Sequence, residues 1–558
     1  MINKISFKLF GVALAGSLAL TSCIQEFEPQ SGTVTGEQAS NAPGAYDNFV
    51  NAITSNISGK FVFSGSNYQQ PNDFGYSALY LRRDVMGQDI VAFNNNWFST
   101  SYQCGVGLAP IYLYSQYFWT FYYTQINSCN TVLELAGENP DDSKIAGVGI
   151  AHTMRAWWYL ELSQTFAQKP YAIDRESLTV PIIREHLDLS SATNNPRATN
   201  EVMFAFILED LDKAETELAN YTRPNKYTPD LSVVYGLKAR TYLLMENWAN
   251  AEKYAKLAQQ GYTMMTGAQY TDRVNGFNNA NSNNAWIMAC TFKSDDPTIT
   301  YNDGDSSWGT WMICEFPGGP SGLGYFNAYG GANYMDRHLY ETIPSTDIRK
   351  KCFVDFSLDE MSSEEEIVEA LSEYSDVPEN VYLTGLAQDA FGGMPLKFRS
   401  AGGNHTDNQV GYCVDVPMMR VEEMMLIEAE AAGMQDLTRG QQLLTSFATE
   451  RDPSFVYGQH NEAYNNTSTP AFRNEIWWQR RVELWGEGHA TFDIKRLQKG
   501  IIRSYAGTNH VDGYRWNTTT PPDWMNICII QTESNYNGAI INNPTPIPPD
   551  GNSPEYKW

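Results

Sequence analysis

Basic residues are scarce in this sequence relative to acidic ones. The 558 residues include 38 Lys and Arg against 64 Asp and Glu, which gives a formal net charge of −26 at pH 7. Nucleic acids and anionic lipid headgroups are bound through basic surfaces. The deficit of basic residues therefore argues against both classes of partner.

Cysteine is also scarce, and its spacing matches no common site. None of the eight cysteines belongs to a CxxC pair, and one of them, Cys23, follows an N-terminal apolar run. The other seven (eight minus one) are widely spaced and odd in number. We therefore expect neither a disulfide framework nor a zinc site, and we expect most of these cysteines to be buried, unreactive thiols.

Motifs of common catalytic and nucleotide sites are missing as well. The sequence has no HExxH, no GxSxG nucleophile elbow, no GxxxxGK[ST] loop and no strand–GxGxxG–helix unit. The stretch Asn302–Ser307, "NDGDSS", has two carboxylates one residue apart, as Ca²⁺ prefers, but it lacks the downstream glutamate of an EF-hand. We predict no enzyme, no catalytic residues and no cofactor. Two interpretations of this loop stay open: a site that binds Ca²⁺, or an acidic surface loop without a metal.

The N-terminus carries a targeting signal. Lys4 and Lys8 precede the apolar run Leu9–Leu20, which at twelve residues is too short to span a bilayer. The run ends in Leu-Thr-Ser-Cys at Cys23, which resembles a bacterial lipobox. This resemblance implies a signal peptide over residues 1–22 and acylation of Cys23, for example by palmitate. The polar residues 23–43 are predicted to form a lipidated tether. No later segment of the sequence reaches eighteen consecutive apolar residues.

Helical repeats dominate the middle of the chain. Tyr235–Gln259 contains Ala239, Tyr242, Ala251 and Ala258, the skeleton of a tetratricopeptide repeat in which small residues let two helices cross closely. Similar pairs of helical segments occur elsewhere: Gly149–Gln168 with Asn200–Tyr221, Val416–Gly433 with Gly440–Asp452, and Gly44–Ile57 with Tyr112–Ala136.

These repeats predict a mostly α fold, a right-handed α-solenoid of about four degenerate repeats. We predict helical repeats over about 44–270 and 410–500 and an irregular, loop-rich insertion over about 271–409. A C-terminal segment, 501–558, completes a single domain over residues 44–558.

The order of several motifs resembles one family, the SusD/RagB outer-membrane lipoproteins of Bacteroidetes. Besides the lipobox, the segments that resemble the family's motifs are Arg155–Ile173 ("RAWWYLELSQTFAQKPYAI"), Thr346–Phe353 ("TDIRKKCF"), Met418–Ala431 ("MMRVEEMMLIEAEA"), Arg480–Arg496 ("RRVELWGEGHATFDIKR") and the looser Pro546–Trp558. The resemblance covers nearly the whole chain.

The family resemblance implies a role. Its members are cell-surface lipoproteins that bind glycan fragments and act as the lid of a SusC-type TonB-dependent transporter in the outer membrane. The alternative is a repeat scaffold that grips a protein partner and has no sugar site. A surface glycoside hydrolase would need two carboxylates facing each other across a cleft, which sequence spacing alone does not test.

The crowded stretch Ile476–Arg496 has three interpretations, one of which is a pH-sensitive or ligand-binding role for His489. Its arginines, acids and His489 could form an acid–base site, or they could form a structural brace that ties the last helix to the solenoid. The tryptophans at 477, 478 and 485 favour a packed wall, and the family resemblance implies a brace. We therefore predict a brace.

Two loops rich in aromatic and amide residues are the predicted glycan site. Flat rings cover sugar faces, and amides or acids pair with the hydroxyl rim. The loops are Phe93–Gly105 and Asp303–Tyr334. Arg82, Arg83 and Asp84 precede the first loop and are expected to contribute hydrogen bonds. The predicted ligand-binding residues are Asn95, Asn96, Trp97, Tyr102, Trp308, Trp311, Tyr325 and Tyr329.

Overall fold

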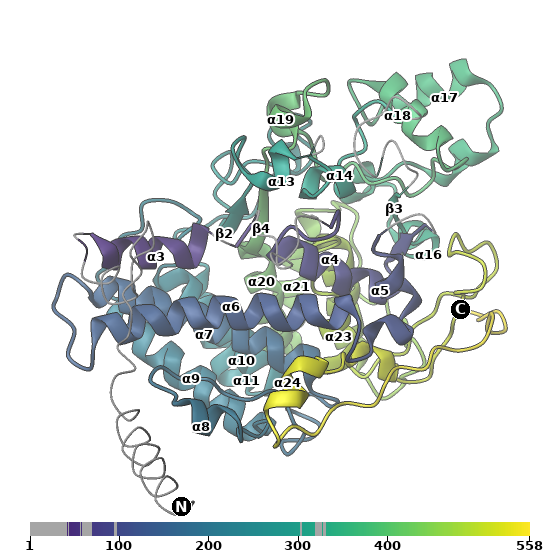
Figure 1. Cartoon of the computed structure of the whole chain (residues 1–558). Helices are drawn as coiled ribbons and strands as arrows, with labels where there is room; N and C mark the ends of the chain where they lie inside the picture. The colour runs from purple at the N-terminus through teal and green to yellow at the C-terminus, as the bar shows by residue number, and fades with distance from the viewer. Residues whose placement is uncertain are drawn as a thin grey trace, which may run out of the picture. The chain divides into compact units, whose positions relative to one another are not determined.

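Helices are the predominant regular secondary structure in the computed structural model of the chain (Figure 1). The structure describes residues 42, 44–55, 57–58, 70–93, 97–301, 304–318, 326 and 331–558, without the side chains of residues 106 and 189. The chain divides into two units, Met1–Asn48 and Phe49–Trp558, and the second contains the helical array and the strands. Among the described residues, no helix is both long and apolar enough to cross a membrane.

The described α-helices are α3 (Ala45–Ser55), α4 (Tyr76–Met86), α5 (Ser99–Gln103), α6 (Leu113–Ala136), α7 (Ile145–Phe166), α8 (Leu189–Ala192), α9 (Asn200–Glu217), α10 (Leu231–Leu244), α11 (Trp248–Ala258), α12 (Gly267–Tyr270), α13 (Pro297–Thr300), α14 (Trp308–Met312), α16 (Arg337–Thr342), α17 (Glu364–Leu371), α18 (Pro378–Leu386), α19 (Asn408–Gly411), α20 (Val421–Gly433), α21 (Leu437–Thr449), α22 (Ala471–Glu483), α23 (Ala490–Arg496) and α24 (Gln531–Tyr536). The 3₁₀ segments are η1 (Val106–Leu108), η3 (Ile348–Cys352), η4 (Phe356–Glu360), η5 (Ala401–Gly403) and η6 (Asp523–Met525), and the strands are β1 (Ile90–Ala92), β2 (Trp286–Thr291), β3 (Asn333–Met335) and β4 (Asp415–Arg420).

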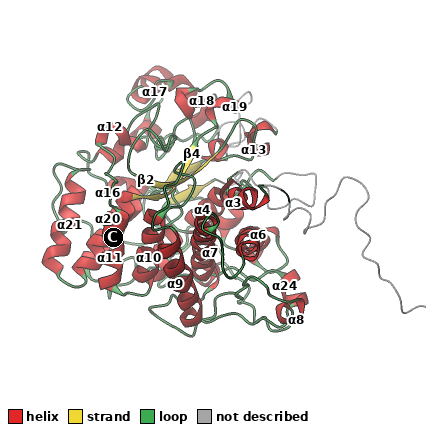
Figure 2. Cartoon of the chain, turned by 90° about the vertical axis from the view of Figure 1, so that its left-hand side faces the viewer, coloured by secondary structure: helices red, strands yellow, loops and turns green. Residues whose placement is uncertain are grey.

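The long helices pack in sequence order as an array. α6 packs on α7, α7 on α9, α9 on α10 and α10 on α11, and α11 then packs on α20, which also contacts α21 and α22 (Figures 1 and 2). The pairs α7–α9, α10–α11 and α20–α21 match three of the predicted hairpins. The predicted mostly α, tetratricopeptide-like fold is confirmed.

The α10–α11 hairpin shows why the repeat residues matter. Ala239, Ala251 and Ala258 are fully buried where the two helices meet. The Tyr242 ring stacks on that of Tyr254, with centroids 5.6 Å apart and planes at 11°. Small side chains therefore allow the close approach, and the rings fill the space beside it.

Polar side chains fix where several of these helices begin. Thr199, Asp230, Asn247 and Asp436 accept hydrogen bonds from the first free backbone amides of α9, α10, α11 and α21. Each cap satisfies an amide that has no partner inside its helix, which contributes about 1 kcal/mol. The repeat boundaries are thus encoded locally in the sequence.

Two short antiparallel ladders join distant segments. β2 pairs with β4, with Thr291 opposite Asp415. The segment between these two strands therefore begins and ends at the same place in the fold. β1 pairs with β3, with Ile90 opposite Met335, so the first loop region joins the insertion. The insertion, predicted as irregular, contains short helices such as α17 and α18 and its own apolar cluster around Val354 and Leu371.

Candidate functional site

Trp97 is an exposed aromatic residue in the turn between β1 and α5. The residue is 38% exposed. Its carbonyl oxygen accepts hydrogen bonds from Asn72 Nδ2 at 2.9 Å and from the hydroxyl of Tyr114. The backbone of the turn is therefore held by polar contacts while part of the indole side chain faces solvent.

Arg82 supports this turn from the protein interior. Its Nη2 donates to the carbonyl of Asn72 at 2.6 Å. Its guanidinium carbon lies 4.7 Å from the ring centroid of Tyr114 and 4.2 Å from that of Tyr117, which are cation–π distances. Arg82 was expected to bind ligand, but it is fully buried. Arg82 therefore supports Asn72 and Tyr114, whose side chains hydrogen-bond to the carbonyl of Trp97.

Two further apolar residues near this turn are exposed. Ile111 is 72% exposed and Tyr112 is 40% exposed, and both lie shortly before Tyr114, whose hydroxyl reaches the carbonyl of Trp97. Sequence reasoning missed Tyr112 because it stands at the start of a helical pattern. Its position as the N-cap residue of α6, with an extended backbone, is what leaves it outside the helix.

The tryptophans of the second loop are buried, contrary to their predicted role. Trp308 and Trp311 have no exposed surface. Trp308 packs edge-on against Phe398 at 5.0 Å, and Trp311 packs edge-on against Phe98 at 5.1 Å while its Nε1 donates to the carbonyl of Pro71. Rings enclosed in this way have no face for a sugar, so the structure assigns them to the core.

Tyr102 also departs from its predicted role. It is buried, and its hydroxyl lies 2.7 Å from Nδ1 of His510. The Arg503 guanidinium lies 4.1 Å from the centroid of its ring. Tyr102 therefore joins the first loop region to the C-terminal segment. The remaining predicted residues, Asn95, Asn96, Tyr325, Tyr329 and the lipidation site Cys23, lie outside the described residues.

The charged residues of Arg480–Arg496 form a buried brace. Glu483 is fully buried and is bonded by three arginines, Arg349, Arg420 and Arg451, at distances of 3.0–3.4 Å. Burial alone would raise the pKa of Glu483, but Arg451, Arg420 and Arg349 hold it well below its ordinary value. Glu483 therefore stays charged and joins η3, β4 and the end of α21 to α22.

Five neighbouring ion pairs extend this brace. Glu487 accepts hydrogen bonds from Arg420 and Lys397, Arg481 pairs with Asp89 at 2.6 Å, and Asp493 pairs with both Arg480 and Arg496. Each of these side chains is buried. The motif therefore ties the turn between α4 and β1, β4, α22 and α23 together, as predicted for a brace.

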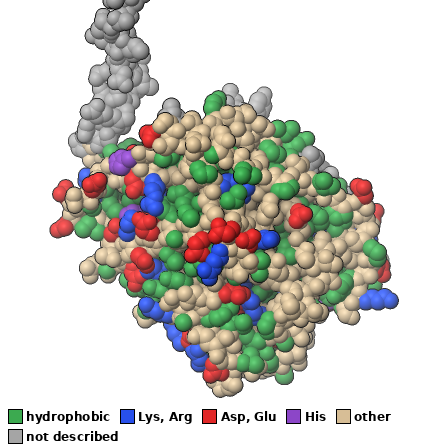
Figure 3. Space-filling view, turned by 90° about the horizontal axis from the view of Figure 1, so that it is seen from below, with side chains coloured by type: hydrophobic (Ala, Val, Ile, Leu, Met, Phe, Trp, Pro, Cys, Tyr) green, Lys and Arg blue, Asp and Glu red, His purple; other side chains and the backbone are tan. Residues whose placement is uncertain are grey.

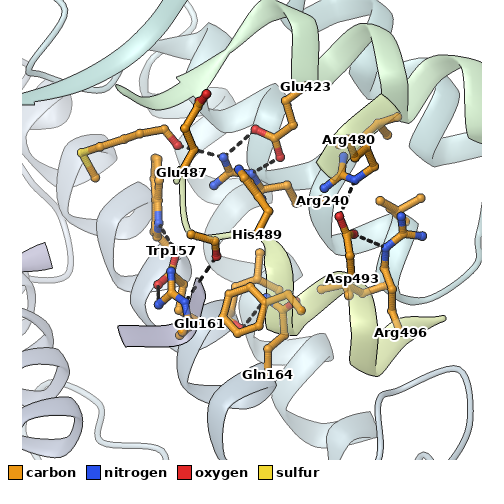
Figure 4. A pocket seen from close by; sticks show the side chains of 18 of the residues that line it. Trp157, Glu161, Gln164, Arg240, Glu423, Arg480, Glu487, His489, Asp493 and Arg496 are labelled. Atoms are coloured by element: carbon orange, nitrogen blue, oxygen red, sulfur yellow. Dashed lines mark hydrogen bonds and ion pairs between the residues drawn. The ribbon is translucent and has the colours of Figure 1, made fainter. Parts of the chain in front are cut away.

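A small cavity lies beside this brace, between α7, α10, α20 and the turn before α23 (Figure 4). Glu161, Arg240, Glu423 and His489 are among its lining residues, and its free volume is about 40 Å³. Burial holds the pKa of His489 well below its ordinary value, and Arg240 and Arg480 lower it further. The cavity has room for a few water molecules.

Neither a metal cluster nor a reactive thiol stands out in the described part of the chain. No group of three or more His, Cys, Asp or Glu side chains is placed to hold a metal ion among those residues. In the predicted Ca²⁺ loop, Asn302 and Asp303 lie outside them. The cysteines of the described residues are free thiols, and all but the half-buried Cys413 are buried.

One face of the molecule, seen in Figure 3, shows acidic and basic side chains intermingled rather than gathered by sign. The helical array carries exposed ion pairs such as Arg184–Glu209 and Lys213–Glu209. Such exposed pairs contribute little stability, about 0–1 kcal/mol each.

Comparison with known proteins identifies relatives over most of the chain. A family model described as "Starch-binding associating with outer membrane" matches residues 80–243, and the model of the SusD family matches residues 340–548. No curated protein matches the sequence significantly.

Solved structures share the fold at low sequence identity. A SusD-like carbohydrate binding protein from Bacteroides vulgatus is 21% identical with a TM-score of 0.68, over 89% of this chain and 97% of that one. A SusD superfamily protein from Bacteroides thetaiotaomicron is 18% identical with a TM-score of 0.64, over 89% and 99%. Surface glycan-binding protein A from Bacteroides thetaiotaomicron, in complex with laminarihexaose, is 15% identical with a TM-score of 0.63, over 89% and 98%.

Proposed function

Because the chain belongs to the SusD/RagB family, we propose that it is a glycan-binding lipoprotein of the outer-membrane surface. In this proposal it delivers oligosaccharides, as a lid, to a SusC-type TonB-dependent transporter. The anchor is the acyl group predicted on Cys23.

The exposed Trp97 ring on its anchored turn carries the glycan-binding part of this proposal. A sugar presents a flat C–H face that stacks on an indole, and hydroxyls at its edge pair with amides. Asn95 and Asn96 precede Trp97 directly and are the proposed hydroxyl partners, and Tyr112 is a proposed second ring. The hydrogen bonds of Asn72 and Tyr114 to the Trp97 carbonyl reduce the entropy that the turn loses on binding.

Titration of ring variants tests the glycan site. A glycan array with residues 24–558 first selects a ligand, and calorimetry then compares Trp97→Ala and Tyr112→Ala with the native protein. We expect Trp97→Ala to weaken binding by about 1–3 kcal/mol, because a large aromatic contact is lost. Its melting temperature should stay unchanged, since the side chain is partly exposed and its backbone contacts remain.

Tyr536→Ala is the matched control. Tyr536 is an aromatic residue in α24 that is 78% exposed, so its loss should leave both affinity and melting unchanged. Unchanged affinity in both Trp97→Ala and Tyr112→Ala would place the site elsewhere. A protein that binds no glycan on the array, yet captures a protein partner on its helical face, would favour the scaffold alternative.

The transporter partnership needs its own test. A tag at the C-terminus of the native lipoprotein, followed by gentle detergent extraction of outer membranes, should recover a TonB-dependent transporter identified by mass spectrometry. Recovery of the lipoprotein without any such transporter, under conditions that preserve other outer-membrane complexes, would contradict the lid role and leave glycan binding untouched.

A further inference from the structure

The part of the sequence that carries the proposed glycan rings has no charged side chain. No Asp, Glu, Lys, Arg or His occurs between Asp89 and Glu134. This stretch contains Trp97 and Tyr112, and Ile111 beside Tyr112 is 72% exposed. The stretch therefore presents apolar groups, amides and hydroxyls to a ligand, and no side chain that can form an ion pair with it.

The second loop adjoins the first and adds only negative charge. Trp311 of the second loop packs edge-on against Phe98 at 5.1 Å, and its Nε1 donates to the carbonyl of Pro71. No lysine, arginine or histidine occurs between Lys293 and Arg337. The charged residues of that stretch are all acidic: Asp295, Asp296, Asp303, Asp305, Glu315 and Asp336. The second loop therefore supplies no cation to a ligand at the proposed rings.

The arginines behind the first loop are enclosed by the protein. Arg82 and Arg503 have no exposed surface, and Arg83 is 3% exposed. Arg83 Nη1 donates to Glu161 Oε2 at 2.7 Å, and Arg503 Nη1 donates to the carbonyl of Tyr102 at 2.8 Å. Guanidinium groups that are bonded to interior partners in this way are not available to a ligand on the surface.

The C-terminal segment beside Tyr102 contributes a partly exposed cation, Arg515. Its Nε donates to the carbonyl of His510 at 2.8 Å, and the His510 ring stacks on that of Tyr102. The acidic Asp512, whose Oδ1 accepts from Asn552, belongs to the same turn. Together Asp512 and Arg515 leave this turn without net charge.

An anionic sugar has no favourable partner at such a surface. Charges more than about 8 Å away are largely screened at physiological salt, so the local groups decide. A uronate or sulfate gives up part of its hydration when its ring packs on an indole, and here no cation replaces that hydration. A neutral sugar has no such penalty, because its C–H face packs on the ring and its hydroxyls pair with amides.

We propose that the ligand is a neutral glycan, one without carboxylate or sulfate groups. This inference rests on the proposed function, since it assumes that a glycan binds at Trp97. Affinity should change by less than about two-fold between low and high concentrations of sodium chloride, because no ion pair is there to be screened. A site that holds an anionic glycan through cations would instead lose affinity steeply over that range.

A glycan array with the native protein tests the charge class directly. The array presents laminarihexaose, maltohexaose and xylohexaose beside oligogalacturonates, alginate fragments and sulfated chondroitin fragments. All strong ligands should be neutral. A uronate or a sulfated glycan as the strongest ligand would overturn the proposal and leave glycan binding itself intact. Absence of binding to every glycan would instead contradict the proposed function, and this inference with it.

A chemical series separates charge from shape. Calorimetry compares the best neutral hexose ligand with the same glycan oxidised to carboxylates at its primary hydroxyls, and with the methyl ester of that product. The carboxylate form should bind about 3–10-fold more weakly than its methyl ester, because the two differ chiefly in charge. Equal or tighter binding of the carboxylate form would also overturn the proposal.

Arg515→Gln tests the partly exposed cation. The variant keeps a donor for the His510 carbonyl but removes the charge, so its affinity for the neutral ligand should stay within about two-fold of the native value. Trp97→Ala is the matched comparison and should lose that ligand. A loss in Arg515→Gln as large as that in Trp97→Ala, with an unchanged melting curve, would show that a cation takes part in binding and would overturn the proposal.

Discussion

Glu483 has no exposed surface and is bonded by Arg349, Arg420 and Arg451. A general acid or base must reach a substrate proton, and this carboxylate is enclosed by its own cations. The same residue types that suggest chemistry in the sequence therefore serve structure here. Whether such a residue is catalytic or structural depends on its burial. The spacing of residues along a helix does not reveal that burial.

Glu483→Gln should destabilise the protein strongly. The substitution keeps the volume but removes the charge that balances three guanidinium groups, and breaking a buried pair in this way costs about 3–5 kcal/mol. Urea denaturation of the variant should show the loss, while glycan affinity of the folded protein should be native. Glu209→Gln is the control, since Glu209 pairs on the surface with 43% of its side chain exposed and should cost less than about 1 kcal/mol. A stable Glu483→Gln protein that loses its ligand would move this helix from brace to binding site.

Glu430 gives the brace a defined dependence on pH. Burial alone would raise its pKa, but Arg496 and Arg473 lower it to about 2, below the ordinary 4.5. A depressed carboxyl pKa stabilises the fold above the unfolded pKa, and that contribution disappears as the pH falls through the folded pKa. The shift corresponds to about 3 kcal/mol at neutral pH, lost between about pH 5 and pH 2.

Comparison of Glu430→Gln with the native protein at several pH values tests this dependence. The difference in unfolding free energy should be largest near pH 7 and should shrink toward pH 2–3, because the unfolded carboxyl takes up a proton below its ordinary pKa of 4.5 while the folded one stays charged until about pH 2. Glu365→Gln, at an exposed position of α17, should show no such trend. A constant difference across the range would mean that Glu430 contributes through packing rather than through its charge.

At the scale of elements, the repeat helices could be predicted because their signals are local. Caps such as Asp230 and small residues such as Ala239 and Ala251 lie within the helices that they define. The rings of the second loop could not be assigned in this way. Trp311 is buried by Phe98 and Pro71, more than two hundred residues away along the chain. Trp97, which precedes Phe98 in the sequence, stays exposed. Aromatic composition is alike in both cases, and only the tertiary contacts differ.

The α20–α21 hairpin depends on glycine at its crossing. A Cβ on Gly440 would lie 2.2 Å from Cα of Gly433 and 2.8 Å from the Phe472 ring. Gly440→Ala should therefore lower stability by about 1–3 kcal/mol through overpacking, although alanine favours helix by about 1 kcal/mol. Thermal melting checks the sign, with Gly538→Ala as the control because no atom lies within 4 Å of its added Cβ. A stabilised Gly440→Ala protein would show that the two helices separate easily.

At the scale of the whole molecule, the fold class and the order of repeats followed from periodicity and from the family resemblance. The way in which the ends of the insertion come together could not be predicted from these signals. Its ends meet through the β2–β4 ladder, and β1 joins it at β3. Such pairings are non-local, and each strand is too short to carry a strong pattern of its own. The residues of the predicted glycan site were hard to predict for the same reason. Which loop residues face solvent depends on these strand pairings.

The last prediction concerns how this molecule is held at the membrane. The lipid predicted on Cys23 is the proposed anchor, and two or more acyl chains suffice for stable attachment. Cys23→Ala should move the protein from the membrane fraction to the soluble fraction, measured in a strain that lacks the transporter so that no partner retains it. Cys413→Ala, which alters a half-buried thiol far from the lipobox, should stay in the membrane fraction. Membrane retention of Cys23→Ala in that strain would require a second anchor and would contradict the lipoprotein assignment.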